Sequence, residues 1–194
     1  MLVVTAIVAL SRRKNLPILH GMEGDAREIY QGKVVHLFVH DVTLPNGHTT
    51  RLEVIRHPGA SAVLPFVSKD QVLLVRQYRF AAGGYLLEVP AGKLDRGEPP
   101  EAAALRETEE ETGFRPGRLE RLGAIFTTPG FTDEIIHLFA AFDLTETRTR
   151  HEADEVLSVE RMPFSEGVAR VERGEITDAK SVSAILLAAR RRAL

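Results

Sequence analysis

The chain has 194 residues, of which 44% are apolar and 27% are charged, and its formal net charge is −2. These values are typical of a soluble globular protein with one sizeable core, and they give no electrostatic basis for nucleic acid or an anionic membrane as the main partner. The sequence contains no cysteine, which excludes disulfides, thiolate zinc sites and a cysteine nucleophile. We expect a cytoplasmic protein.

The N-terminal segment is almost wholly apolar from Leu2 to Leu10 and is followed by three basic residues, Arg12, Arg13 and Lys14. Nine residues are too few to span a bilayer. A secretory signal also carries its positive charge before the apolar run, whereas here the charge comes after it. We therefore interpret residues 1–23 as an N-terminal extension, with Met22 as an alternative start, and expect no membrane partner.

Residues 33–57 have the pattern of a β-hairpin. Two strand-like apolar runs flank Leu44-Pro45-Asn46-Gly47, which is a strong turn signal. Pro58-Gly59 then interrupts the chain. We place a boundary here, between an N-terminal hairpin subdomain of residues 24–57 and a main domain of residues 58–194.

The main domain contains many short strands and few helices. Strands are predicted at residues 60–67, 71–75, 86–89, 119–126, 134–142 and 156–159, and helices at residues 99–112, 164–173 and 179–192. Pro99-Pro100 opens the first helix and Gly113 stands just past its end, as expected for helix start and stop signals. The few, separate helices predict an α+β class with a mixed β-sheet in an α/β/α sandwich.

The helix at residues 99–112 carries a cluster of carboxylates. At about 100° per residue, Glu107, Glu110 and Glu111 share one face, whereas Glu109 points away. Like charges at these spacings repel and weaken a helix. The cluster suits a hard divalent cation such as Mg²⁺, which prefers oxygen ligands. A solvated acidic helix face is the alternative that composition alone leaves open.

A longer pattern surrounds this helix. Gly92 precedes Glu98 by six residues, and Arg106 opens the run RETEEETGF. The pattern resembles the Nudix box, Gly-x5-Glu-x7-Arg-Glu-U-x-Glu-Glu-x-Gly-U, where U is a bulky aliphatic residue. Every charged and glycine position is matched over 23 residues, and the one departure is Thr108 at the first U position. We expect Thr108 to face the core beside Leu105, with a small packing cost and no effect on metal binding.

The resemblance to the Nudix family implies a fold and a metal site. In this family the box binds magnesium, and the ligands implied here are the carbonyl of Ala91 and the carboxylates of Glu107, Glu110 and Glu111. Arg106 would orient a box carboxylate, and Glu98 would help to fix the motif. The implied cofactor is Mg²⁺, or Mn²⁺ or another divalent cation. Such ions bridge phosphates, neutralise their charge and activate a water for attack on phosphorus.

Segments outside the box resemble one branch of the family. Residues 74–79 (LVRQYR) and 87–92 (LEVPAG) are similar to the ADP-ribose pyrophosphatases, as is Pro129, which stands sixteen residues beyond Gly113. Together with the hairpin, this resemblance extends over residues 28–190. It therefore implies a nucleoside diphosphate derivative as the substrate.

Three residues are candidates for contacting that substrate. We place Arg79 near the phosphates or the terminal ribose, because a guanidinium bridges two anionic oxygens; the alternative is a surface arginine in an ion pair. Glu88 is next to the metal site in the sequence. Phe131 either stacks on the base or packs within its loop, and the sequence favours packing.

The resemblance places the catalytic base on the acidic loop at residues 150–155 (RHEADE). Glu152 matches the position of the family's base. Asp154 matches a residue that reaches the metals, although aspartate in place of the commoner glutamate shortens that reach. Solvated loop carboxylates are the alternative, and in that case Glu110 becomes the candidate base.

These observations predict Mg²⁺-dependent hydrolysis of ADP-ribose to AMP and ribose 5-phosphate. The resemblance also implies a homodimer in which the hairpin packs against a second subunit, because two strands alone hide little apolar surface. GDP-mannose, another nucleotide sugar or FAD is the alternative substrate. A Nudix-fold binding module without turnover is less consistent with the sequence, since no box glutamate is lost. A glycosidase would not need three carboxylates on one helical face.

Overall fold

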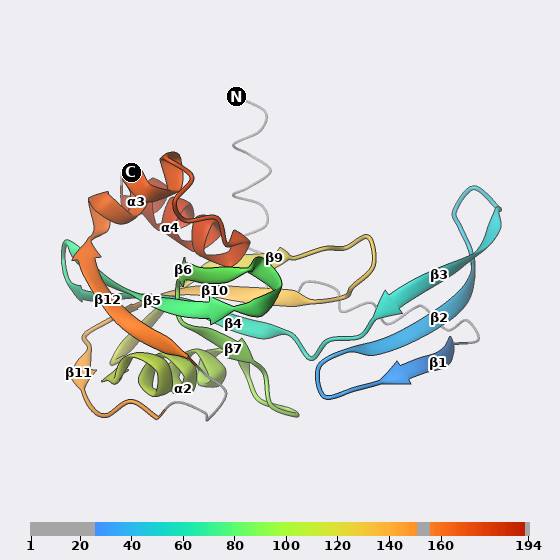
Figure 1. Ribbon diagram of the computed structural model, residues 1–194, viewed down its shortest axis with the longest axis horizontal. Coiled ribbons are helices and arrows are strands. Elements are labelled where there is room, and N and C mark those ends of the chain that lie inside the picture. The colour runs from blue at the N-terminus through green and yellow to red at the C-terminus, as the bar shows by residue number, and fades with distance from the viewer. Residues whose placement is uncertain (1–25, 151–155, 193–194) are drawn as a thin grey trace. The chain divides into compact units, whose positions relative to one another are not determined.

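The computed structural model describes residues 26–150 and 156–192 (Figure 1). These residues form two compact units, which are described separately. The first contains residues 26–57 and 128–134, and the second contains residues 58–127, 135–150 and 156–192. The predictions for residues 1–23, Glu152 and Asp154 lie outside the described residues.

The first unit is an antiparallel sheet of three strands in the order β1 (Ala26–Gln31), β2 (His36–Thr43) and β3 (Thr49–Ile55). The predicted hairpin is confirmed as β2 and β3. In its turn, Gly47 donates its backbone N–H to the Leu44 carbonyl and has a φ of 83°, which glycine adopts without steric cost. Strand β1 was not predicted, because all six of its residues are exposed and its sequence has no apolar alternation.

The segment Thr128–Glu134 is attached to the end of β3. The Ile55 backbone N–H donates to the Phe131 carbonyl at 2.8 Å, and the Arg56 Nη1 donates to the Asp133 Oδ2 at 2.9 Å. The other Asp133 carboxylate oxygen accepts from the His57 backbone N–H at 2.8 Å. This attachment was not anticipated from the sequence, because it joins residues that are 76 positions apart.

The second unit contains a mixed seven-stranded sheet. Its strands are β4 (Ala60–Ser68), β5 (Gln71–Arg79), β6 (Gly84–Glu88), β7 (Ala91–Lys93), β9 (Arg118–Phe126), β10 (Ile135–Phe142) and β12 (Leu157–Pro163). The order is β12-β5-β4-β10-β9, and β4 and β10 are parallel. Near their shared turn β4 and β5 pair with each other, whereas farther along β6 pairs with β5 and β7 pairs with β4. The β6–β7 junction therefore lies within the sheet, between its two halves.

Helices cover both faces of this sheet. Helix α2 (Pro100–Thr112) lies on one face, and α3 (Phe164–Glu172) and α4 (Ala179–Arg192) lie on the other (Figure 1). The short elements are η1 (Phe80–Ala82), β8 (Phe114–Arg115) and β11 (Thr145–Glu146). The predicted fold class, an α+β fold with an α/β/α sandwich and an N-terminal hairpin, is confirmed. Within the described residues, no helix has the length and apolar character needed to cross a membrane.

Side chains of β4 belong to the hydrophobic cores on both faces of the sheet. Leu64 belongs to the cluster that includes Ile185 of α4, whereas Val63 belongs to the cluster that includes Ala104 of α2. Successive side chains of a strand point to opposite faces, so a central strand that is covered on both sides is apolar at nearly every position. This is why residues 60–67 form a continuous apolar run in the sequence.

Helix α2 has the predicted start and stop. Pro100 is its first residue, and Gly113 ends it with a φ of 73° and a backbone N–H that donates to Glu109 O. Thr108 is fully buried, and its hydroxyl donates to the Ala104 carbonyl at 2.7 Å. The expectation that Leu105 faces the core beside Thr108 was wrong, because Leu105 is 39% exposed. It lies about 60° farther round the helix, at the edge of the buried arc.

We predict that Gly113→Ala lowers the free energy of unfolding more than Gly83→Ala does. The two glycines follow helical segments and have nearly the same positive φ, 73° and 74°. Each alanine should therefore incur a left-handed penalty of about 1 kcal/mol. At Gly113 an added Cβ also meets the backbone nitrogen of Thr149 at 3.3 Å, whereas at Gly83 it meets nothing within 4 Å. Equal shifts in the urea midpoints would show that this contact is irrelevant.

Candidate functional site

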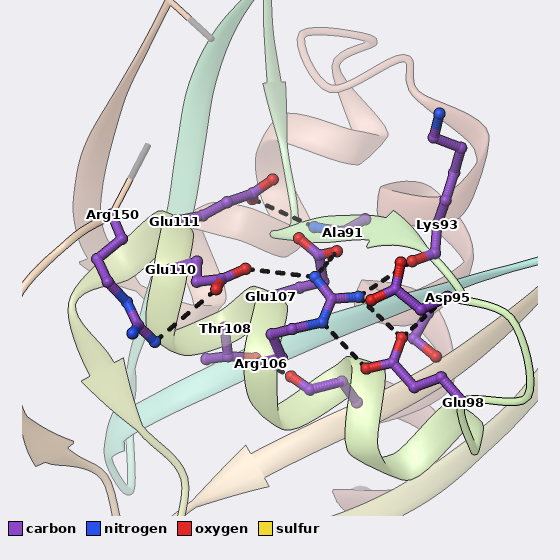
Figure 2. A network of polar contacts seen from close by, with 12 residues as sticks. Ala91, Lys93, Asp95, Glu98, Arg106, Glu107, Thr108, Glu110, Glu111 and Arg150 are labelled. Carbon is purple, nitrogen blue, oxygen red and sulfur yellow. Dashed lines mark hydrogen bonds and ion pairs between the residues drawn. The ribbon is translucent and has the colours of Figure 1, made fainter. Parts of the chain in front are cut away.

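Carboxylates from α2 lie beside the β6–β7 junction (Figure 2). Glu111 is buried, and its Oε2 accepts a hydrogen bond from the Ala91 backbone N–H at 3.2 Å. The Glu107 carboxylate lies so close to Gly92 that a Cβ at this position would overlap it. The loop that precedes the helix is therefore packed directly against two of the predicted metal ligands, and only glycine leaves room for this approach.

One guanidinium connects most of the site. Arg106 donates from Nε and Nη2 to both oxygens of Glu98, at 3.0 and 2.9 Å. Its Nη1 donates to Glu107 at 2.6 Å and to Glu110 at 3.3 Å, and Nη2 also reaches the Lys93 carbonyl at 3.1 Å (Figure 2). The hydrogen bond from Arg106 outweighs burial and lowers the pKa of Glu98, so this pair stays ionised at neutral pH.

The fourth glutamate of the run is turned away from this network. Glu109 accepts two hydrogen bonds from Arg115, at 2.8 and 2.9 Å. Glu110 instead faces Arg106 on one side and Arg150 on the other, where the Arg150 Nη2 lies 3.8 Å from its Oε1. The Arg150 backbone N–H also donates to the Glu110 carbonyl at 2.9 Å. The chain is therefore anchored to α2 at Arg150, two positions before Glu152 in the sequence.

The donors around the junction suit a hard divalent cation. They are carboxylate oxygens from Glu107, Glu110 and Glu111 together with the backbone at Ala91, and Mg²⁺ binds such oxygens in preference to nitrogen or sulfur. Within the described ranges, no three acidic or histidine side chains are already arranged as a metal site. Glu107 and Glu110 are held by Arg106 instead. If these two carboxylates bind a cation, they would have to turn from the guanidinium toward it.

Arg79 and Glu88 form a second cluster. The Arg79 Nε and Nη2 donate to the two oxygens of Glu88 at 2.9 and 2.8 Å. Burial would raise the pKa of Glu88, but the hydrogen bonds and charges of Arg79 and Lys180 outweigh it, and the net effect lowers that pKa. Glu88 is buried, whereas 39% of the Arg79 side chain is exposed. Of the two, Arg79 is the group that is available to an incoming ligand.

Phe131, the remaining candidate for substrate contact, lies in the first unit. It is 51% exposed on the segment Thr128–Glu134. Its carbonyl accepts from Ile55 and its own N–H donates to the Thr128 carbonyl, so the backbone is fixed while the ring remains exposed. Because the Phe131 ring is exposed, it does not pack within its loop. Stacking of this ring on the nucleobase of the substrate stays a prediction.

Lys180 was not predicted as a site residue, although it joins the cluster of Arg79 and Glu88. Its ammonium lies 2.5 Å from the Glu88 Oε2 and 3.0 Å from the Asp178 Oδ2. Asp178, directly before a helical pattern, was recognisable as a helix-start signal. The link to Glu88 was not recognisable, because it spans 92 positions and no local pattern encodes it.

Comparison with known proteins identifies the family. The family model described as the NUDIX domain matches residues 55–185. The chain belongs to the Nudix family. An ADP-ribose pyrophosphatase of Bacillus subtilis is 42% identical over 160 residues, which cover 81% of this chain and 86% of the relative. A GDP-mannose pyrophosphatase of Cronobacter sakazakii is 36% identical over 166 residues, covering 77% and 84%.

The fold agrees with this assignment. The crystal structure of an ADP compounds hydrolase superposes with a TM-score of 0.77 at 25% identity, covering 86% of this chain and 91% of that chain. The resemblance to the Nudix family and to its ADP-ribose pyrophosphatase branch is confirmed. The Nudix box of this chain is the loop and helix from Gly92 to Phe114, which carry the network of Figure 2.

We predict that Gly92→Ala weakens Mg²⁺ activation. The new Cβ would occupy the space of the Glu107 carboxylate, which must then move away from the Nudix loop. We expect the Mg²⁺ concentration for half-maximal turnover to rise by about tenfold, the effect of losing one well-placed ligand contact. Gly84→Ala is the matched control, since its added Cβ meets nothing within 4 Å. Identical Mg²⁺ titrations for the two variants would contradict the close approach.

The Glu98–Arg106 pair predicts a pH dependence of stability. The folded-state pKa of Glu98 is below its ordinary value of 4.5, so its ionised form stabilises the fold above that pH, and this contribution disappears as the pH falls through the folded-state pKa. The difference in unfolding free energy between the wild type and Glu98→Gln should therefore be largest near neutral pH and shrink in acid. The control is Glu101→Gln, which removes an exposed carboxylate from α2. A difference that is constant from pH 7 to pH 3 would rule out this linkage.

Proposed function

We propose that this chain is a Mg²⁺-dependent pyrophosphohydrolase that converts ADP-ribose and water to AMP and ribose 5-phosphate. The proposal is carried by the contacts of Glu111 and Glu107 with the Ala91–Gly92 loop and by the Arg106 guanidinium, which joins Glu107 to Glu110 in the same unit as Arg79. The 42% identity to an ADP-ribose pyrophosphatase supports this choice of substrate. The intact set of box glutamates supports turnover rather than binding alone.

Different residues of the site have different roles in this reaction. When bound, the cation neutralises phosphate charge and makes the attacking water more acidic. Glu107, Glu110 and Glu111 would hold it, and the Ala91 N–H fixes Glu111 for that role. Arg106, anchored on Glu98, holds Glu107 and Glu110 close to this position until a cation binds.

Arg79 would orient the substrate. Its Nε and Nη2 are occupied by Glu88, while no acceptor within the described residues takes a hydrogen bond from its Nη1. A guanidinium held along one edge presents its other N–H groups in a fixed direction, which suits a phosphate oxygen.

In the proposed reaction, water attacks one phosphorus of the substrate. The bond from that phosphorus to the bridging oxygen breaks, and a base takes the proton of the water.

We predict that Glu152 is this base. Glu152→Gln should lower kcat by about 10²- to 10⁴-fold with little change in KM, because proton removal is needed in the transition state and not in binding. Asp154→Asn should instead weaken apparent Mg²⁺ affinity. The two variants are compared side by side across a magnesium titration. Full kcat in both at every Mg²⁺ concentration would place the base elsewhere, with Glu110 the next candidate.

A substrate screen tests the proposed activity. ADP-ribose, GDP-mannose, NADH, FAD and diadenosine polyphosphates are incubated with Mg²⁺, and the products are resolved by chromatography. We expect AMP and ribose 5-phosphate from ADP-ribose at the highest kcat/KM. The relative in Cronobacter sakazakii makes GDP-mannose the second candidate. A higher kcat/KM for GDP-mannose would replace the proposed substrate, and the absence of Mg²⁺-dependent products from every compound would overturn the proposed activity.

We also propose a cytoplasmic homodimer with no nucleic-acid or membrane partner, formed through the first unit. This unit exposes large apolar side chains on β1, on the β1–β2 connection and on β3, namely Ile29, Tyr30, Val34, Val35 and Leu52. A dimer interface would remove such side chains from water. We predict twice the chain's mass of 21.5 kDa by light scattering at micromolar concentration. A fully active species of 21.5 kDa would contradict the dimer.

A further inference from the structure

A buried polar network joins the first turn of α4 to the strand end that precedes Ala91. The Lys180 ammonium contacts the Glu88 Oε2 and the Asp178 Oδ2. The same Asp178 oxygen accepts from the Ser181 N–H at 3.0 Å and from the Ser181 hydroxyl at 2.6 Å. The Ser181 Oγ in turn accepts from the Val89 backbone N–H at 2.8 Å. One helical turn thus holds both the Glu88 side chain and the backbone that follows it.

The charges of this network are balanced. It contains two carboxylates, Glu88 and Asp178, and two cations, Arg79 and Lys180, and both Glu88 and Lys180 are buried. An ammonium removed from water is stabilised only by close anionic partners. Lys180 has two of them, which fixes its position between the strand and the helix.

Both oxygens of Glu88 are engaged by these contacts. Its Oε1 accepts from the Arg79 Nε, and its Oε2 accepts from both the Arg79 Nη2 and the Lys180 Nζ. Lys180 therefore limits the rotation of the Glu88 carboxylate about the terminal bond of its side chain. That rotation sets the plane of the Arg79 guanidinium, because a bidentate pair is nearly coplanar.

We propose that Lys180 is a positioning residue for the anionic part of the substrate: through Glu88 it holds the partly exposed Arg79 guanidinium in the orientation that binds phosphate. This inference rests on the proposed function. Lys180 does not itself touch substrate, because its ammonium is buried against Glu88 and Asp178. Without Lys180, the Glu88 carboxylate loses one of its partners, and the Arg79–Glu88 pair is held less rigidly although Arg79 keeps its charge. Binding of ADP-ribose then includes the cost of ordering that side chain.

A purely structural role is the competing interpretation. Asp178 already caps α4 by accepting from the Ser181 N–H, and such capping stabilises a helix whether or not a ligand is present. If Lys180 is only structural, its substitution lowers stability and changes the ADP-ribose affinity by the same factor whether or not Arg79 is present. If Lys180 positions Arg79, its substitution changes the affinity only while Arg79 is present. A double-mutant cycle separates these cases.

The experiment measures ADP-ribose binding by isothermal titration calorimetry with EDTA present, so that no turnover occurs. The variants are Lys180→Met, Lys180→Gln, Arg79→Gln and each Lys180 substitution combined with Arg79→Gln. Lys180→Gln retains a hydrogen-bond donor and serves if the methionine variant does not fold, as judged by circular dichroism. Lys69→Met, which removes an exposed ammonium from a turn, is the matched control.

We expect either Lys180 substitution to raise Kd by about tenfold, the effect of ordering one long side chain on binding. Each double variant should bind within about twofold of Arg79→Gln alone, and the control should bind like the wild type. With Mg²⁺ present, KM should rise in parallel with Kd while kcat changes by less than about twofold. Unchanged Kd in a folded Lys180 variant, or multiplicative effects in the double variant, would overturn the positioning role. Failure of the wild type both to bind ADP-ribose in EDTA and to hydrolyse it with Mg²⁺ would instead overturn the proposed substrate.

Discussion

The carboxylate-rich face of α2 depends on Arg106. Glu107 and Glu110 share one helical face, and their negative charges would weaken a helix on which they stood alone. Arg106 donates to both and is anchored by two further hydrogen bonds on Glu98. Repulsion between the carboxylates is thus offset by one guanidinium whose position is fixed by the loop before the helix. In the absence of a cation, Arg106 thus balances the charge of Glu107 and Glu110.

The second constraint is the close approach of the loop to the helix. Gly92 leaves space for the Glu107 carboxylate, and the Ala91 N–H donates to Glu111. The β6–β7 junction lies within the sheet, where β4 and β5 have separated, so both the loop and the helix are supported by the core. On the other face, α4 supports the same junction through Ser181 and Val89. The two helix layers therefore converge on one short stretch of backbone.

Much of this could be predicted from the sequence, because the relevant signals are local. The turn at Asn46-Gly47, the apolar run of β4 and the proline and glycine that bound α2 each determine a nearby structure. The spacing of the box glutamates also placed them on one side of a helix. These features need only neighbouring residues to be recognised.

The remaining features depend on contacts between distant segments. Strand β1 is wholly exposed, so no apolar period marks it. The attachment of Asp133 to Arg56 and the link of Lys180 to Glu88 join positions that are 77 and 92 residues apart. Leu105 was placed in the core from its apolar character, although the helix rotates it to the edge of the buried arc. Tertiary packing decides each of these cases.

The central claim is that the α2 carboxylates hold a divalent cation at the Ala91–Gly92 loop. It is tested most directly by Mn²⁺ binding in the absence of substrate, with free Mn²⁺ followed by electron paramagnetic resonance. Glu111→Gln removes a carboxylate at the loop, and Glu109→Gln removes one that pairs with Arg115 instead. We expect Glu109→Gln to bind Mn²⁺ like the wild type and Glu111→Gln to bind at least about tenfold more weakly. Equal Mn²⁺ affinity in all three proteins would contradict the claim.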